Sequence, residues 1–158
     1  MMRPKRAVPE AYRHTTVPAN QTRQHIEDML MQAGAGGVAW QSARTPTTLL
    51  MALRFAYRER TYRFNLSLVG TDAKTDKDRA QDERQRMRAL YHGLKAMLNQ
   101  DAFGIIRFED AAVTWAEVAL PKGGTTTVGE VIRDQLEQCR FPSLAAVLPA
   151  LPSHQNGG

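Results

Sequence analysis

The longest stretch of the chain with one clear period covers residues 79–100, and it predicts a central α-helix. Apolar side chains recur there at spacings of three and four residues, which places them on one stripe of a helix. These apolar positions are Met87, Leu90, Tyr91, Leu94, Met97 and Leu98. A second stripe is basic and carries Arg84, Arg88, His92 and Lys95, with Arg79 and Arg86 beside it. We therefore expect a helix that packs on a sheet and carries a basic surface.

A shorter helix is expected before this one, at about residues 22–33, with Thr22 as its N-cap. Its apolar stripe consists of Ile26, Met29, Leu30 and Ala33. A glycine cluster at residues 34–37 ends the helix. The alternation of Val38 and Trp40 with their neighbours then predicts a short strand, followed by a loop over residues 42–47.

Residues 48–69 have the strongest strand pattern and predict a β-hairpin centred on Glu59 and Arg60. This register puts four apolar pairs on one face, and a slip by one residue would mix the faces. The pairs are Tyr57 with Tyr62, Phe55 with Phe64, Leu53 with Leu66 and Met51 with Leu68. Because Glu-Arg suits a two-residue turn poorly, a four-residue loop about the same centre is expected. The opposite face is basic and uncovered, and it carries Arg54, Arg58 and Arg63.

The C-terminal part predicts a helical lobe. Its first short helix is expected from the spacing of Phe108, Ala112, Trp115 and Ala119, although residues 105–108 could begin as a strand. Thr127-Val-Gly-Glu130 is a capping box, which predicts the start of a longer helix that ends before Pro142. The apolar residues 142–152 are expected to pack on the body as one turn.

Together these elements predict an α+β fold. It has a three-stranded antiparallel sheet with helices on one face, in the order α-β-β-β-α, plus a C-terminal helical lobe. The single domain is expected to span residues 20–152. Residues 1–19 hold prolines and positive charges without a period, which fits either a flexible basic arm that follows phosphates or a terminus with no role. Residues 153–158 are expected to form a disordered tail.

The composition favours an anionic partner. The 158 residues include 21 Lys and Arg against 16 Asp and Glu, which gives a net charge of +5. Sixteen of the 21 are Arg, whose planar fork pairs well with phosphate. Cys139 is the only cysteine, which excludes an intrachain disulfide and suits a reducing cytosol. Without a long apolar run or a secretory signal, the expected location is the host-cell cytoplasm, with no membrane partner.

Motifs for catalysis are missing from the sequence. Residues 121–127, PKGGTTT, are only superficially similar to a phosphate loop and fit a plain turn. Glu109 and Asp110 fit either half of a carboxylate metal site or solvated carboxylates at a helix start. We therefore expect no enzyme activity, no metal and no cofactor.

Clustered arginines suggest a nucleic-acid-binding site, because phosphate neutralisation needs groups of cations. The predicted nucleic-acid-binding residues are Arg54, Arg58, Arg63, Arg79, Arg84, Arg86, Arg88 and Lys95. The other interpretation is a solvated basic face, since Arg84 and Arg88 could pair with acidic residues on neighbouring helical turns. The hairpin aromatics alternate onto the inner face, which counts against base stacking.

A series of short motifs runs from the central helix to the C-terminus. They are Arg84-x-Arg86-x-Arg88-Ala-Leu90, Leu94-Lys95-Ala96, Gly104-Ile105-x-x-Phe108-Glu109, Leu120-Pro121, Thr127-Val128-Gly129-Glu130 and Pro149-Ala150-Leu151. In these motifs the chain resembles a family of small uncharacterised proteins of phages and prophages, over about residues 22–151. It departs from the family at His25, where Glu is expected, at residues 97–99, and in a longer turn after Pro121. The resemblance implies a phage or mobile-element origin and supplies no catalytic residues.

The order of elements is also similar, at the level of fold alone, to double-stranded-RNA-binding domains and to the core of phage single-strand annealing proteins. The leading hypothesis is a phage-type, non-enzymatic protein that binds nucleic acid, preferably single-stranded DNA, in replication or recombination. The alternative is a protein–protein interaction module, such as a phage inhibitor or an accessory factor acting on a host complex. Both hypotheses are compatible with a homo-oligomer. A continuous basic strip across the hairpin and the central helix favours the first hypothesis, and an exposed apolar patch favours the second.

Overall fold

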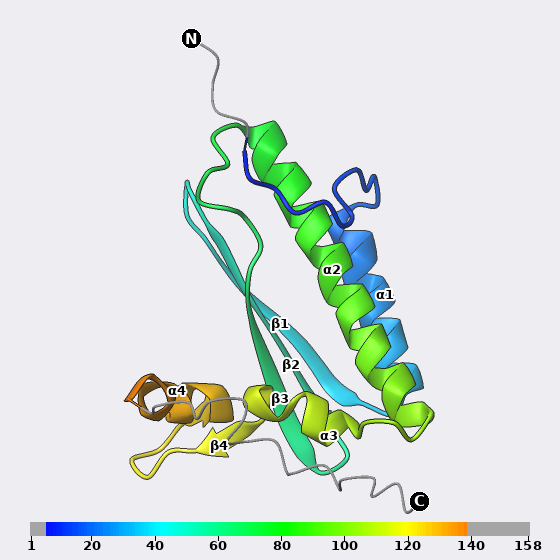
Figure 1. Ribbon diagram of the computed structural model, residues 1–158, viewed down its shortest axis with the longest axis vertical. Coiled ribbons are helices and arrows are strands. Elements are labelled where there is room, and N and C mark those ends of the chain that lie inside the picture. The colour runs from blue at the N-terminus through cyan, green and yellow to red at the C-terminus, as the bar shows by residue number, and fades with distance from the viewer. Residues whose placement is uncertain (1–5, 139–158) are drawn as a thin grey trace, which may run out of the picture.

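The computed structural model describes residues 6–138, and its architecture confirms the predicted α+β class. The elements are α1 (Ala19–Gln32), β1 (Gly36–Arg44), β2 (Leu49–Tyr57), β3 (Arg60–Ser67), α2 (Asp76–Ala102), α3 (Phe108–Ala111), the 3-10 turn η1 (Val113–Trp115), β4 (Glu117–Ala119), β5 (Thr125–Thr127) and α4 (Val128–Gln138). Strands β1, β2 and β3 form an antiparallel sheet, and α1 and α2 cover one of its faces (Figure 1). The β4-β5 hairpin is connected to the β3 edge through a bridge between Tyr62 and Ala116. Expectations for residues 1–5 and 139–158 lie outside the described residues.

The core lies between the sheet and the two long helices. Met87 and Leu94 of α2 and Ile26 and Leu30 of α1 are all buried. They form one cluster with the inner face of the sheet, whose aromatic members are buried as predicted: Phe55, Tyr57, Tyr62 and Phe64. Phe108 of α3 joins this cluster and meets the Tyr62 ring edge-on, with 5.2 Å between the ring centroids.

The hairpin has the predicted faces but a different register. Phe55 pairs with Tyr62 and Leu53 with Phe64, so each partner lies two residues from the predicted one. The two-residue turn is Arg58–Glu59, and both residues have positive φ angles, 48° and 70°. A two-residue turn with positive φ at both positions matches the right-handed twist of the strands. The predicted four-residue loop is therefore not formed. Because the shift is by two residues, the paired strand residues stay on their predicted faces. Arg58 is the exception, since it was predicted on the outer face and lies in the turn.

Both long helices begin earlier than predicted. Helix α1 starts after Pro18, so Thr22 lies inside the helix and is buried, and the prediction that it is the N-cap is wrong. Helix α2 starts after Thr75, whose Oγ accepts a hydrogen bond of 3.0 Å from the Asp78 backbone N–H. The additional turn brings Lys77 onto α2.

The strand and helix bounds also differ at two other places. Strand β1 continues to Arg44, because residues that were expected in a loop pair with the start of β2. The short helix expected up to Ala119 is limited to α3 and η1, since Ala119 lies in β4 and pairs with Thr125. In both places pairing with a neighbouring strand decides the backbone conformation. The local pattern of hydrophobic residues does not indicate such pairing.

The predicted N-cap of the last helix is confirmed. Helix α4 begins directly after Thr127, whose Oγ accepts a hydrogen bond of 3.4 Å from the Glu130 backbone N–H. The Glu130 carboxylate accepts from the Thr126 hydroxyl and from Asn65 Nδ2 (3.4 Å). Glu130 therefore links α4 to β3, and the second half of the predicted capping box is not formed.

We expect Phe64→Ala to lower the free energy of unfolding by about 3–5 kcal/mol, because it removes a buried ring from the core. Phe64 stacks on Phe55 and on Trp115, with centroid distances of 5.9 and 5.3 Å. Urea unfolding would measure the loss. The control is Leu50→Ala on the outer face, which should change stability by no more than about 0.5 kcal/mol. Equal effects of the two substitutions would contradict the assignment of the faces.

Candidate nucleic-acid interface

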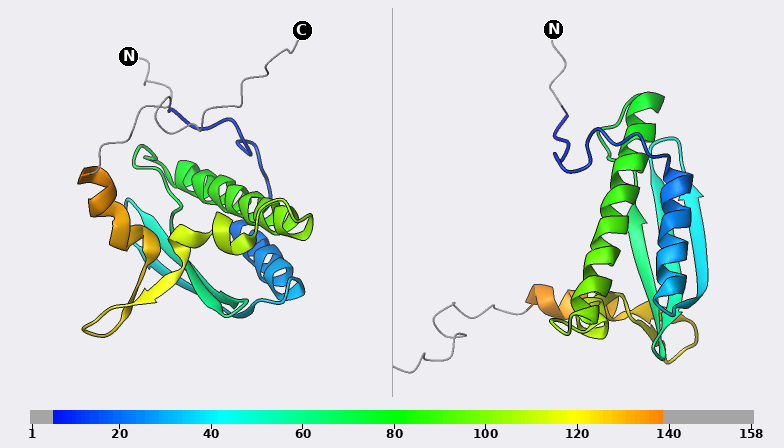
Figure 2. Two further views of the ribbon diagram at one scale, coloured as in Figure 1. Left: turned by 60° about the horizontal axis from the view of Figure 1, so that its bottom comes forward. Right: turned by 90° about the vertical axis from the view of Figure 1, so that its right-hand side faces the viewer.

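The predicted binding residues fall on two opposite sides of the domain. Arg54, Arg58 and Arg63 belong to the β2-β3 hairpin, and Arg54 and Arg63 pair with each other on its outer face. Helix α2 covers the other face of the sheet (Figure 2). The basic strip expected to run across hairpin and helix is therefore divided into two separate surfaces.

Carboxylates neutralise two of the sheet arginines. Arg54 donates to both Glu117 oxygens, at 2.7 and 3.0 Å, and Arg58 donates to both Asp101 oxygens, at 2.8 and 2.6 Å. These hydrogen bonds are the main reason why the pKa values of Glu117 and Asp101 lie below their usual values. A phosphate would have to displace an arginine from a bidentate ion pair. Arg54 and Arg58 are therefore poor phosphate contacts, while Arg63 on the outer face forms no ion pair with a described carboxylate and its Nε is buried without a hydrogen-bond partner.

Two of the predicted binding residues on α2 form contacts within the domain. At about 100° per residue, Arg79 and Arg86 lie about 160–180° around the helix from Lys95, rather than beside the basic stripe. Arg79 pairs with Asp76, and Arg86 donates a hydrogen bond of 2.8 Å to the Ser67 carbonyl. These two side chains connect α2 to its own first turn and to the end of β3.

The remaining cations of α2 form a straight line on the helix surface, which we call the α2 basic stripe. Its members are Lys77, Arg84, Arg88 and Lys95. They lie within about 20° of a common line and extend over about 27 Å, because α-helices rise about 1.5 Å per residue. No carboxylate that the structure describes lies within 4.0 Å of their charged nitrogens. Arg84, Arg88 and Lys95 were predicted as binding residues from the sequence. Lys77 was not, although Thr75 and Asp78 around it form an N-terminal capping pattern.

The acidic residues of α2 are kept away from this stripe. Each lies about 100° or more around the helix from its line. They are Asp76, Asp78, Asp82, Glu83 and Asp101. The line itself is therefore positive although the whole helix is close to neutral, while Asp78 and Asp82 of α2 and Asp28 of α1 line the grooves beside it.

Two open grooves run along the stripe. The first is bordered by the N-terminal segment and contains Arg13, His14, Lys77 and Arg84. The second lies between α1 and α2 and contains His25, Arg88, Tyr91 and Lys95. In the second groove the Tyr91 ring lies 4.7 Å from Arg88 Cζ and 5.9 Å from Lys95 Nζ.

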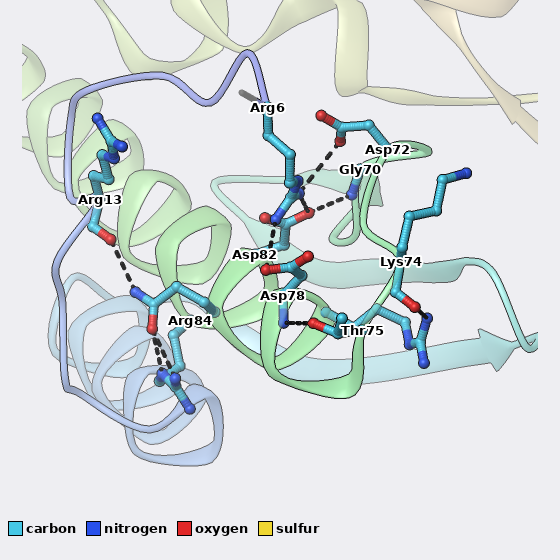
Figure 3. Close-up of polar contacts among 11 residues, drawn as sticks. Arg6, Arg13, Gly70, Asp72, Lys74, Thr75, Asp78, Asp82 and Arg84 are labelled. Atoms are coloured by element: carbon cyan, nitrogen blue, oxygen red, sulfur yellow. Dashed lines mark hydrogen bonds and ion pairs between the residues drawn. The ribbon is translucent and has the colours of Figure 1, made fainter. Parts of the chain in front are cut away.

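The N-terminal strap, residues 6–18, lies along α2 rather than away from the domain, where a flexible arm was expected. Arg6 forms an ion pair of 2.7 Å with the buried Asp82, which also accepts a hydrogen bond from the Gly70 backbone N–H (Figure 3). Asp72 and Asp78 lie within 3.3 and 3.5 Å of the same guanidinium. The buried charge of Asp82 thus requires a cation, and Arg6 supplies it.

Two glutamines of α2 hold the rest of the strap. Gln85 Nε2 donates to the carbonyls of Pro9 and Ala11, both at 2.7 Å. Gln81 Nε2 donates to the carbonyls of Arg13 and Thr15, at 3.0 and 3.1 Å. These four bonds satisfy backbone groups of a segment that has no helix or strand of its own.

The carboxylates Glu109 and Asp110 do not form a metal site. Glu109 is buried and lies 3.5 Å from Arg58 and 3.6 Å from Arg107, so its charge is compensated by arginine. In the part of the chain that the structure describes, no group of three His, Cys, Asp or Glu side chains is arranged to hold a metal ion. Within the same residues no helix combines the length and the hydropathy needed to cross a membrane.

Comparison of the chain with protein-family models, curated proteins and solved structures finds no match. The assignment of a ligand therefore depends on the geometry of this molecule alone.

We expect the carboxyl group of Asp101 to titrate below its usual pKa of 3.8 in the folded protein, because Arg58 and the Phe108 backbone N–H bind its ionised form. The stability from this pair should be complete above about pH 4 and should be lost as the pH falls through the lowered pKa. Side-chain carboxyl NMR can follow the titration. Arg58→Ala should move the pKa of Asp101 upward. A titration at or above 3.8 in the wild-type protein would contradict the ion pair.

Proposed function

We propose that this protein binds nucleic acid, preferably single-stranded DNA, through the α2 basic stripe. In this proposal it catalyses no reaction and acts in the replication or recombination of a phage or related mobile element. The observation that carries the proposal is the alignment of four cations on one helix face without a described carboxylate partner. Arg6, Arg54 and Arg58 are each held in ion pairs, whereas the four cations of the stripe form none with a described residue.

The geometry of the stripe supports contact with a phosphate backbone. Four cations over about 27 Å suit a linear polyanion better than a compact ligand, which would meet one or two of them. Arg84 and Arg88 supply planar forks for phosphate oxygens, and Lys77 and Lys95 supply point charges at the two ends. Because phosphates carry no sequence information, the binding should tolerate any sequence.

Aromatic rings beside the stripe support the preference for single strands. Tyr91 lies between Arg88 and Lys95, and His92 contacts Tyr91 with 5.1 Å between the ring centroids. Proteins that bind single strands combine a basic groove with aromatic side chains on which bases stack. The hairpin aromatics do not contribute, because they are buried in the core.

Affinity should depend steeply on salt. For about four phosphate contacts on a single strand, the slope of log K against log salt should be about −3. Replacing Arg84 and Lys95 together by Gln should reduce the slope by about 1.4 and weaken binding at low salt. Fluorescence anisotropy with a labelled oligonucleotide of about 20 residues, between about 50 and 200 mM salt, would measure both effects.

The matched control for this test is Lys122→Gln with Arg133→Gln, which removes the same charge from exposed positions on the β4-β5 turn and α4. This control variant should bind almost as well as the wild type. The proposal fails if the wild-type protein shows no binding at low salt, or if the control variant loses as much affinity and slope as the stripe variant.

An exposed apolar loop favours protein–protein interaction as a second candidate function. Phe103, Ile105 and Ile106 follow the end of α2 and are 80, 70 and 43% exposed. Such a group of large apolar side chains is typical of an interaction surface. In this alternative, the wild type and the Arg84→Gln, Lys95→Gln variant should both capture the same host protein. The variant Phe103→Ser with Ile105→Ser should not capture it. Capture that instead requires the stripe would remove the support for this candidate.

A further inference from the structure

Tyr12 has an unusual backbone conformation at the centre of the N-terminal strap. Its φ angle is +57°, in the left-handed region that side chains with a Cβ atom disfavour. The carbonyl groups on either side of it, those of Ala11 and Arg13, accept the hydrogen bonds from Gln85 and Gln81. Helix α2 therefore holds the strap in this conformation from both sides. Strained residues that the surroundings hold in place occur often at binding sites.

The conformation of the strap places the Tyr12 ring on His92. The two rings are parallel within 6°, and their centroids are 4.7 Å apart. Tyr12 remains 40% exposed, so part of its surface is open to solvent. His92 in turn meets the edge of the Tyr91 ring at 5.1 Å. Three aromatic rings from the strap and α2 thus form one continuous group.

This aromatic group lies directly beside the α2 basic stripe. His92 follows Arg88 by four residues and precedes Lys95 by three, so both cations are neighbours of its ring on the helix surface. Burial, and then the charges of Arg88 and Lys95, lower the pKa of His92, so the imidazole is neutral near neutral pH. The group therefore offers an uncharged stacking surface between two phosphate-binding positions.

The polar contacts that anchor the strap do not involve the Tyr12 side chain. Arg6 and the two glutamines supply the ion pairs and hydrogen bonds that hold residues 6–15. Those contacts use the Arg6 side chain and backbone carbonyls. The exposed ring of Tyr12 is thus available to a ligand.

We propose that Tyr12, supported by His92, is a stacking platform for an unpaired base of the bound strand. The base lies on the solvent side of the Tyr12 ring, and the neighbouring phosphates contact Arg88 and Lys95. This inference rests on the proposed function, and it adds the feature that distinguishes ligands. Bases in a duplex are already stacked on each other, so only single-stranded nucleic acid can use the platform.

The test compares Tyr12→Ala and Tyr12→Phe in the full chain. The ligands are a labelled single strand, the same strand with abasic residues, and a duplex of equal length, all at low salt. Tyr12→Ala should lower the affinity for the single strand about 5- to 150-fold, which corresponds to the loss of one stacked base. Tyr12→Phe should keep the affinity within about twofold of the wild type, because the ring remains.

Two further results are expected from the same titrations. The abasic strand and the duplex should bind wild type and Tyr12→Ala equally. The salt slope for the single strand should not change in Tyr12→Ala, because no phosphate contact is lost. An equal loss of affinity for all three ligands would overturn the platform, since it would mean that the substitution disturbs the strap as a whole.

The outcomes separate the platform from the proposed function. In one outcome the wild type binds the single strand and the Arg84→Gln, Lys95→Gln variant does not, while Tyr12→Ala binds like the wild type. This outcome overturns the platform and leaves the proposal of phosphate binding intact. If the wild type binds none of the three ligands, both proposals are overturned.

Discussion

Burial of one apolar stripe of α2 on the aromatic face of the sheet is the constraint on which the rest of the structure depends. Once Met87 and Leu94 point into the core, the direction of every other side chain on this helix follows from the helical period. Arg79 and Arg86 point toward carboxylate and carbonyl partners. Lys77 and Lys95 are exposed, whereas Arg84 and Arg88 are half-buried and contact Gln81 and Tyr91. The basic surface is thus a consequence of how the core is packed.

Carboxylates then divide the arginines of this protein into two groups. Arg6, Arg54 and Arg58 each form close ion pairs with acidic residues far away in the sequence, and they connect the strap, the hairpin and the C-terminal elements to the central body. The cations of the α2 basic stripe have no such partner among the described residues. The net charge of +5 therefore does not describe how charge is distributed over the surface, because Asp82, Asp101 and Glu117 are used in ion pairs within the domain.

The local periods of the sequence were sufficient to predict the fold class, the central helix and the two faces of the hairpin. They were not sufficient for the hairpin register, because a shift by two residues preserves the faces and only the turn geometry decides between the alternatives. The ion pairs of Arg54 with Glu117 and of Arg58 with Asp101 join residues 63 and 43 positions apart, and no spacing rule predicts such pairs. For the same reason the sheet arginines were expected to be free, and the strap with Tyr12 was expected to be an arm without fixed contacts.

The most direct test of this account is an NMR titration of the full chain with a short single-stranded oligonucleotide. The side-chain nitrogen signals report separately on the two groups of cations. The account predicts shifts at Arg84, Arg88 and Lys95 and at the Tyr12 and His92 rings, while the Nε signals of Arg54 and Arg58 stay unchanged in their ion pairs. Shifts concentrated at Arg54 and Arg58, or no shifts on α2 at saturating oligonucleotide, would contradict it.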